Sequence, residues 1–199
     1  MTAFSALLDE VYTITNRPDL VGETTSALKA ATLKMHHTDF YAKDLYETGV
    51  LFPIADYQQQ FQYKQIIPLY RSFKYARVTD PSTTPVGLKQ FFEMISIDNS
   101  LDSYKLNREN VVYLAGTQLN FRSITQFQNI LFGCYLHPSV IPDTYNSWIA
   151  DEHPYSIIFE TARAVFRMIG FDEMAAKMDA LVNEEVGMLR SSQLALVGE

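Results

Sequence analysis

The sequence predicts an α+β protein in which a small helical bundle, formed by N- and C-terminal helices, is interrupted by a large β-rich insertion. Near both ends of the chain, apolar residues recur at three- and four-residue spacing, which is the pattern of a helix with one buried face. Between them the sequence is rich in aromatic residues and is divided by turn residues, as is typical of strands. We expect residues 1–44 and 147–199 to form the bundle and residues 45–146 the insertion.

The clearest pattern is a helical hairpin over residues 154–190. Pro154 suits a first helical turn, because the N–H that it lacks would have no partner there. Gly170 ends this helix, since glycine readily adopts the left-handed conformation that often closes one. A second helix is expected over residues 172–190, followed by a loose tail. One hairpin buries too little apolar surface to be stable alone, so we expect it to pack on the N-terminal helices.

Two helices are predicted at the N-terminus, over residues 3–15 and 19–36, with a break at Asn16 to Pro18. The buried face of the second helix is rich in small residues, among them Ala27 and Ala31. Small side chains allow a close approach of another helix, either from the C-terminal pair or from a neighbouring subunit.

The insertion is predicted to contain several strands separated by turns. The expected strands are residues 45–52, 61–69, 73–78, 111–114, 117–121 and 130–136, and residues 88–94 are ambiguous between helix and strand. Pro53 to Asp56 is expected to be a turn, and Ala115 with Gly116 is expected to turn a hairpin. Tyrosines are frequent here, and they are interpreted either as half-buried packing or as a protein interface.

Composition excludes several classes of protein. A net charge of −7 argues against an affinity-driven nucleic-acid binder, which needs a basic face. No apolar run approaches the roughly 20 residues that span a bilayer, and no signal segment is recognisable, so we expect a soluble intracellular product without a membrane partner. The single cysteine, Cys134, lies in an apolar run, which predicts a buried thiol with a raised pKa and no internal disulfide.

The sequence offers little for catalysis or for cofactor binding. It contains no phosphate-binding loop, no dinucleotide fingerprint and no nucleophile elbow. His36 and His37 are adjacent and would point about 100° apart on a helix, so they cannot share one metal ion. His137 and His153 have no partner at zinc-ligand spacing. We therefore expect no metal and no cofactor.

Two pairs of acidic residues could in principle serve as the acid and base of a glycosidase: Asp151 with Glu152, and Glu184 with Glu185. Adjacent residues on a helix do not converge on one substrate atom, which favours surface charge. The expectation is that the protein is not an enzyme. Residues 151–199 hold nine acidic and four basic residues, a balance of −5.

The run HPYSIIFETARAVFRMIG over residues 153–170, followed by an Ala- and Glu-rich helix, resembles the head-to-tail adaptor proteins of tailed double-stranded DNA bacteriophages, the tail-tubular or head-completion connector group. Residues 28–35, passing through Phe40 and Tyr41 into a strand, are similar to that family's entry into its β region. Residues 113–119 and 142–148 also resemble phage structural proteins. The insertion is longer and richer in tyrosine than in the smallest members of the family.

The resemblance implies a structural protein of the virion neck or tail, made in the host cytoplasm. It implies a homo-oligomeric ring of twelve copies below the portal protein, contacting a tail or nozzle protein, with DNA passing through the channel without sequence-specific binding. It also implies that the C-terminal tail reaches into the portal. On that basis Leu194, Leu196 and Val197 are candidate portal-anchor residues, although a frayed terminus is the alternative.

Other functions remain open at this point. The chain could be another virion assembly component, such as a tail terminator, neck or baseplate subunit, which would be dominated by β-structure. It could also be a phage cell-wall hydrolase, which would need a cleft holding two carboxylates at working separation. A binding module of another kind is the last alternative.

Overall fold

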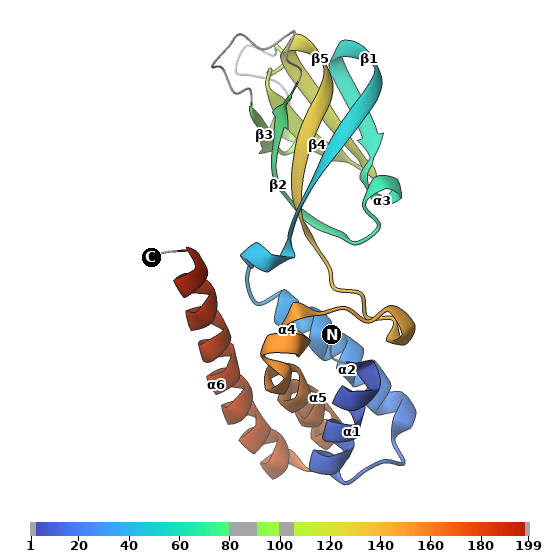
Figure 1. The fold of residues 1–199 in the computed structure, drawn as a ribbon, viewed down its shortest axis with the longest axis vertical. Helices are drawn as coiled ribbons and strands as arrows, with labels where there is room; N and C mark the ends of the chain where they lie inside the picture. The colour runs from blue at the N-terminus through green and yellow to red at the C-terminus, as the bar shows by residue number, and fades with distance from the viewer. Residues whose placement is uncertain (1–2, 80–90, 100–105, 198–199) are drawn as a thin grey trace. The chain divides into compact units, whose positions relative to one another are not determined.

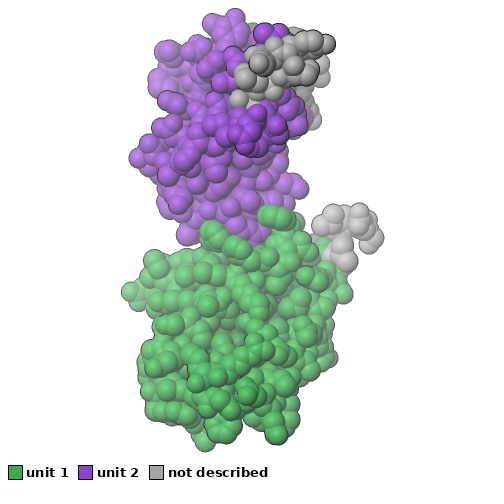
Figure 2. Space-filling model, turned by 180° about the vertical axis from the view of Figure 1, so that it is seen from behind, with its two compact units in different colours: residues 1–44, 137–199 green, residues 45–136 purple. Residues whose placement is uncertain are grey.

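The computed structural model describes residues 3–79, 91–99 and 106–197, and the side chains of these residues up to 193. The chain divides into two compact units, coloured separately in Figure 2. We call Met1–Asp44 with His137–Glu199 the helical unit, and Leu45–Leu136 the β unit. The chain thus returns from the β unit at His137, ten residues before the expected boundary at residue 147.

Helix α5 is at the centre of the helical unit (Figure 1). Its helices are α1 (Phe4–Thr15), α2 (Val21–His36), α4 (Trp148–Glu152), α5 (Pro154–Met168) and α6 (Asp172–Val197). Helix α5 packs against the other four. As the sequence predicts, Pro154 is its first residue and Gly170 has a φ of 77° just beyond its end. The Phe171 N–H donates to Phe166 O at 2.9 Å, the bond that closes a glycine-terminated helix.

The buried side chains of the helical unit fall into two clusters. The larger one joins α1, α2, α4, α5 and α6 and includes Leu7, Leu28 and Ile157. The smaller one lies between α5 and α6 and includes Ala162, Phe166 and Met178. Residues outside the helices contribute too, since Tyr41 and Tyr145 belong to the larger cluster.

The described residues of the β unit form five strands and one short α-helix. These are β1 (Leu45–Gln62), α3 (Tyr63–Ile66), β2 (Tyr70–Val78), β3 (Phe91–Ile95), β4 (Val111–Ala115) and β5 (Gln118–Leu136). Strand β5 pairs with β4 along its first part and with β2 along its last part. Because β2 pairs with β3 and β3 with β4, these four strands close into a barrel, and β1 is added outside it along β5 (Figure 1).

Strands β1 and β5 keep one antiparallel register over almost their whole length. Leu51 lies opposite Asn129 and Gln58 lies opposite Arg122, so seven residues separate the two pairs on both strands. Between them the pairing is irregular, and residues 53–58 of β1 are all exposed. The buried face of β1 changes from even-numbered to odd-numbered residues across this break, from Phe52 to Phe61. The irregularity therefore rotates β1 without changing its partner.

Phenylalanine dominates the core of the β unit. Phe61 stacks on Phe121 and meets Phe132 edge-on, with ring centroids 5.8 and 5.4 Å apart. Gly133 of β5 lies opposite Tyr75 of β2, and a β-carbon at Gly133 would be 2.7 Å from the Tyr75 ring. Glycine is thus needed there for the close approach of the tyrosine.

The predicted architecture, a small helical bundle carrying a β-rich insertion, is wrong. The strands form a closed four-stranded barrel with a fifth strand, the helices are divided between the two ends of the chain, and a single bundle core is not shown. Local periodicity predicts that a strand exists, but it does not predict that four strands close into a ring. Closure depends on β5 being long and bent enough to pair with β4 and β2 on the same edge.

Two predictions about the first strands are wrong because the length of β1 is set by its pairing with β5, which is distant in the sequence. Pro53 to Asp56 does not turn the chain back, because β1 continues through it to Gln62. The expected strand over residues 61–69 is instead the end of β1 followed by α3. Proline is tolerated in β1 because this strand has a neighbour on one edge only.

Candidate functional site

The predicted anchor residues belong to the last turn of α6. The sequence predicts a loose tail after residue 190, which is wrong, because the helix continues to Val197. With 26 residues and about 1.5 Å of rise per residue, α6 is roughly 39 Å long. The side chains of Leu194, Leu196 and Val197 lie outside the described part of the structure, so only their place on the helix is known.

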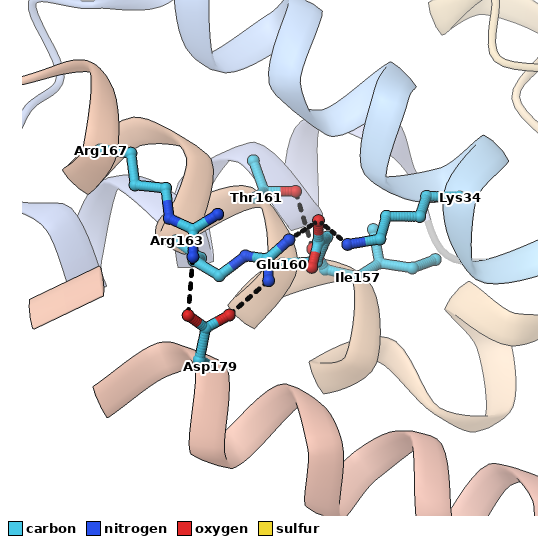
Figure 3. A network of polar contacts seen from close by, with 7 residues as sticks. All are labelled: Lys34, Ile157, Glu160, Thr161, Arg163, Arg167 and Asp179. Carbon is cyan, nitrogen blue, oxygen red and sulfur yellow. Dashed lines mark hydrogen bonds and ion pairs between the residues drawn. The ribbon is translucent and has the colours of Figure 1, made fainter. Parts of the chain in front are cut away.

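A chain of ion pairs fastens α6 to α5 and α5 to α2 (Figure 3). Asp179 of α6 accepts from Arg163 and, at 2.7 Å, from Arg167, both of α5. Glu160, also of α5, accepts from Arg163 and from Lys34 of α2, the latter at 2.7 Å. Helix α6 is thus held at a fixed place along α5 by charge as well as by apolar packing.

The two carboxylates of this network have different surroundings. The Glu160 side chain is 8% exposed and has a cation on either side, whereas the Asp179 side chain is 35% exposed. The hydrogen bond from Arg163 holds the pKa of Asp179 below its usual value. The network brings together residues as far apart in sequence as Lys34 and Asp179, and no local pattern predicts such pairs.

The outward face of α6 carries small and acidic residues. Ala176, Ala180 and Gly187 are exposed on it, as are Glu173 and Glu184. Among the residues that the structure describes, no cation forms an ion pair with either acid, in contrast to Asp179. Lys177 and Arg190 are exposed on α6 as well, so its exposed side combines small residues with charges of both signs.

The other acidic pair of the sequence, Asp151 with Glu152, lies at the end of α4. Glu152 accepts from Lys43 Nζ at 2.5 Å, which makes it part of a surface ion pair. Among the described residues, no group of three histidine, cysteine or acidic side chains could hold a metal ion.

His36 is the centre of a buried polar cluster that sequence analysis missed. Its Nδ1 lies 2.8 Å from Asp44 Oδ1 and its Nε2 lies 2.9 Å from Ser147 Oγ. Trp148 Nε1 donates to the same Asp44 oxygen at 2.8 Å. Asp44, His36 and Ser147 are connected in the same order as the acid, base and nucleophile of a hydrolase triad. However, Ser147 is 4% exposed, and its Oγ already accepts from the Ala150 N–H as the cap of α4.

This cluster therefore has a structural role in the geometry seen here. A nucleophile must reach its substrate, and Ser147 is enclosed. Asp44 is the last residue before the chain leaves the helical unit, and Ser147 follows its return. Through its contacts with Asp44 and Ser147, His36 therefore holds both the outgoing and the returning segment of the chain against α2.

The remaining histidines lie in the helical unit, and the cysteine lies in the β unit. His37 and His137 stack on each other with ring centroids 5.0 Å apart, a contact between residues 100 positions apart that the sequence does not predict. Ser192 Oγ lies 3.3 Å from His153 Nε2, near the end of α6. Cys134 is fully buried, as predicted, and burial raises its pKa to about 11.

The β unit has the more apolar surface, and much of it lies along β1. Leu51 and Ile54 are each 69% exposed and Tyr57 is 50% exposed, all at the irregular part of the strand. Beside them is a cleft of about 460 Å³ lined mainly by polar groups, including those of Asp56, Gln60 and Arg122. Tyrosine and arginine are enriched at protein interfaces, and both are present at this part of the β unit.

Comparison with known protein families and with curated proteins gave no match. No helix in the described part of the chain is long and apolar enough to cross a membrane.

Proposed function

We propose that this protein is a structural head-to-tail adaptor of a tailed bacteriophage. Twelve copies would form a ring below the portal protein, join the capsid to a tail or nozzle protein and line the DNA channel. The observation that carries the proposal is α6, a long terminal helix fixed to α5 by the Asp179 ion pairs and ending in the apolar residues Leu194, Leu196 and Val197. A rigid helix with an apolar end suits insertion into a partner ring.

The surfaces of the two units support an assembly role. Each unit has its own buried core, so each can present a separate face to a different partner. The helical unit offers α6, and the β unit offers the exposed apolar residues of β1. A connector between two larger assemblies needs two such faces.

The charge of α6 supports the proposed channel. Glu173 and Glu184 are exposed on its outward face. An acidic lining repels phosphate, which lets DNA slide without binding. A density map of the assembled ring with a lumen dominated by Lys and Arg would contradict this part of the proposal.

Binding to the portal ring encoded by the same phage is the experiment that tests the adaptor. The full chain should form a high-order ring on the portal, measured by mass photometry and by electron microscopy. Truncation after Gln193 removes only the last turn of α6, so it should leave the helical unit folded, and it should weaken portal binding at least tenfold. Full-length protein that does not bind the portal would overturn the adaptor proposal.

The control for the anchor is an exposed apolar residue elsewhere on α6. Met188 is 47% exposed, so Met188→Asp changes charge and apolar surface on the same helix. Replacing Leu194, Leu196 and Val197 by Asp should abolish docking, while Met188→Asp should dock normally. Equal docking by the triple variant and wild type would reject the anchor but leave the adaptor standing.

A further inference from the structure

Strand β1 has a free edge. In the closed barrel, β2, β3, β4 and β5 each have a neighbour on both sides, whereas β1 pairs only with β5 (Figure 1). Every second residue of β1 therefore directs its N–H and C=O groups away from the sheet. Among the described residues, β1 is the strand whose second edge has no neighbour along its whole length, so another strand can add there.

Residues 58–62 of β1, which we call the edge segment, lack the features that normally protect such an edge. Natural edge strands carry lysines, prolines or short lengths that prevent pairing. The edge segment reads QQQFQ and contains no charge, no proline and no glycine. The side chains of Gln58, Gln60 and Gln62 are exposed, while Phe61 is buried in the core and holds the strand in place.

The edge segment is also complementary to itself. From Tyr57 to Tyr63 the sequence YQQQFQY reads almost the same in both directions about Gln60. In an antiparallel pair centred on Gln60, Gln58 lies opposite Gln62 and Gln60 lies opposite its own copy. Each glutamine amide offers both donors and an acceptor, so like residues can hydrogen-bond to each other across the pair.

We propose that the edge segment of β1 pairs antiparallel with the edge segment of a second copy of this chain, forming a two-fold symmetric dimer. A second copy is favoured over a strand of another protein, because the uncharged, near-palindromic segment places glutamine opposite glutamine when it pairs with its own copy. The pairing joins identical surfaces, as two-fold symmetry requires. Five paired residues bury little area, so the dissociation constant is expected on the order of 10 μM.

This inference does not rest on the proposed adaptor function. A cyclic ring of identically oriented copies contains no two-fold contacts between neighbours. The dimer is therefore the form of the free protein, and it must separate when a ring assembles. Failure of the dimer would leave portal docking untouched, because docking is tested through the end of α6.

A charge added at the centre of the pair tests the dimer. In Gln60→Lys two like charges meet across the two-fold axis, with Cβ atoms about 5 Å apart, and the same holds for Gln60→Glu. Sedimentation equilibrium over roughly 1–200 μM should show each variant dimerising at least tenfold more weakly than wild type. An equimolar mixture of the two variants should dimerise again, because opposite charges then face each other.

The control is Asn183→Lys, the same added charge at an exposed position of α6 in the helical unit. It should dimerise as wild type does. Recovery in the mixture also shows that the Gln60 variants are folded. Wild type that stays monomeric across the range, a Gln60→Lys variant that dimerises like wild type, or a mixture that does not recover would each overturn the inference.

Discussion

The two units of this protein have cores of different chemistry. Of the eleven buried polar or charged residues among those described, ten lie in the helical unit and one, Ser123, lies in the β unit. They include His36, Asp44 and Glu160, each with charged or polar partners. The core of the β unit consists instead of apolar residues, with phenylalanine prominent.

The difference indicates how each unit keeps a unique structure. Helices can slide along each other with little loss of apolar contact, and a buried ion pair or hydrogen bond selects one position. Strands in a closed barrel are fixed by their backbone pairing, so shape-specific aromatic packing is sufficient. Charge changes should therefore weaken the helical unit, and loss of side-chain volume should weaken the β unit.

The chain carries one reporter for each unit, so the comparison can be tested directly. Its only tryptophan, Trp148, lies in the helical unit and its only cysteine, Cys134, lies in the β unit. Tryptophan emission follows unfolding of the helical unit. Because Cys134 is buried, labelling by a thiol reagent follows opening of the β unit.

The largest effect is expected from Phe132→Ala in the β unit. The Phe132 side chain is fully buried and contacts the rings of Phe61, Tyr70 and Phe73. Its loss leaves a cavity and should destabilise the unit by about 3–5 kcal/mol. Labelling of Cys134 should accelerate by several orders of magnitude, while the urea midpoint of the Trp148 signal stays close to that of wild type.

A matched control is Phe91→Ala, since Phe91 is 51% exposed. It should change the labelling rate little. Equal acceleration by both variants would mean that the aromatic core does not determine the stability of the β unit.

Glu160→Gln should have the next largest effect, and in the other unit. It removes the negative charge to which both Lys34 and Arg163 donate, and a hydrogen bond to a charged group contributes about 1.5–3 kcal/mol. The urea midpoint of the Trp148 signal should fall, and the Cys134 labelling rate should stay unchanged. Glu173→Gln on the exposed face of α6 is the control, with an expected change within about 0.5 kcal/mol.

Acid should weaken the helical unit through Asp179. The Arg163 hydrogen bond lowers the pKa of this carboxyl in the folded state, so its contribution is present above the ordinary Asp pKa of about 3.9 and is lost as pH falls through the lowered value. Stability of wild type, followed by Trp148 emission, should therefore decrease below about pH 4. Asp179→Asn should show a flatter decrease over the same range, and an unchanged pH profile would rule out the linkage.

The smallest effect is expected for Lys43→Met. Its ammonium pairs with Glu152 and lies 5.2 Å from the centroid of the Trp148 ring, but the Lys43 side chain is 32% exposed and the Glu152 side chain is 46% exposed. Exposed pairs contribute about 0–1 kcal/mol, so the urea midpoint should move slightly while the Trp148 emission spectrum shifts. A loss as large as that of Glu160→Gln would show that exposure does not separate the two pairs.

The sequence predicted the helices better than the strands. Helices expected over residues 3–15 and 19–36 are present as α1 and α2, because their apolar periodicity and their breakers are local signals. Helix α4 was missed, since five residues are too few to show a period. The extent of β1 and the barrel closure were missed because both depend on pairing partners far away in the chain.

The candidate sites also differ in how well the sequence predicts them. Burial of Cys134 could be predicted from its apolar neighbours. The Lys34, Glu160 and Asp179 network and the His36 cluster could not, because their members lie up to 145 residues apart and charged residues on helices usually face water. The anchor residues of α6 stay a prediction.

The most direct test of the adaptor proposal is the mass of the purified protein, alone and after mixing with the portal ring encoded by the same phage. We predict a small species in the free state, monomer in equilibrium with dimer, and a complex with a ring of copies once the portal is present. A protein whose mass is the same with and without the portal would contradict the adaptor function.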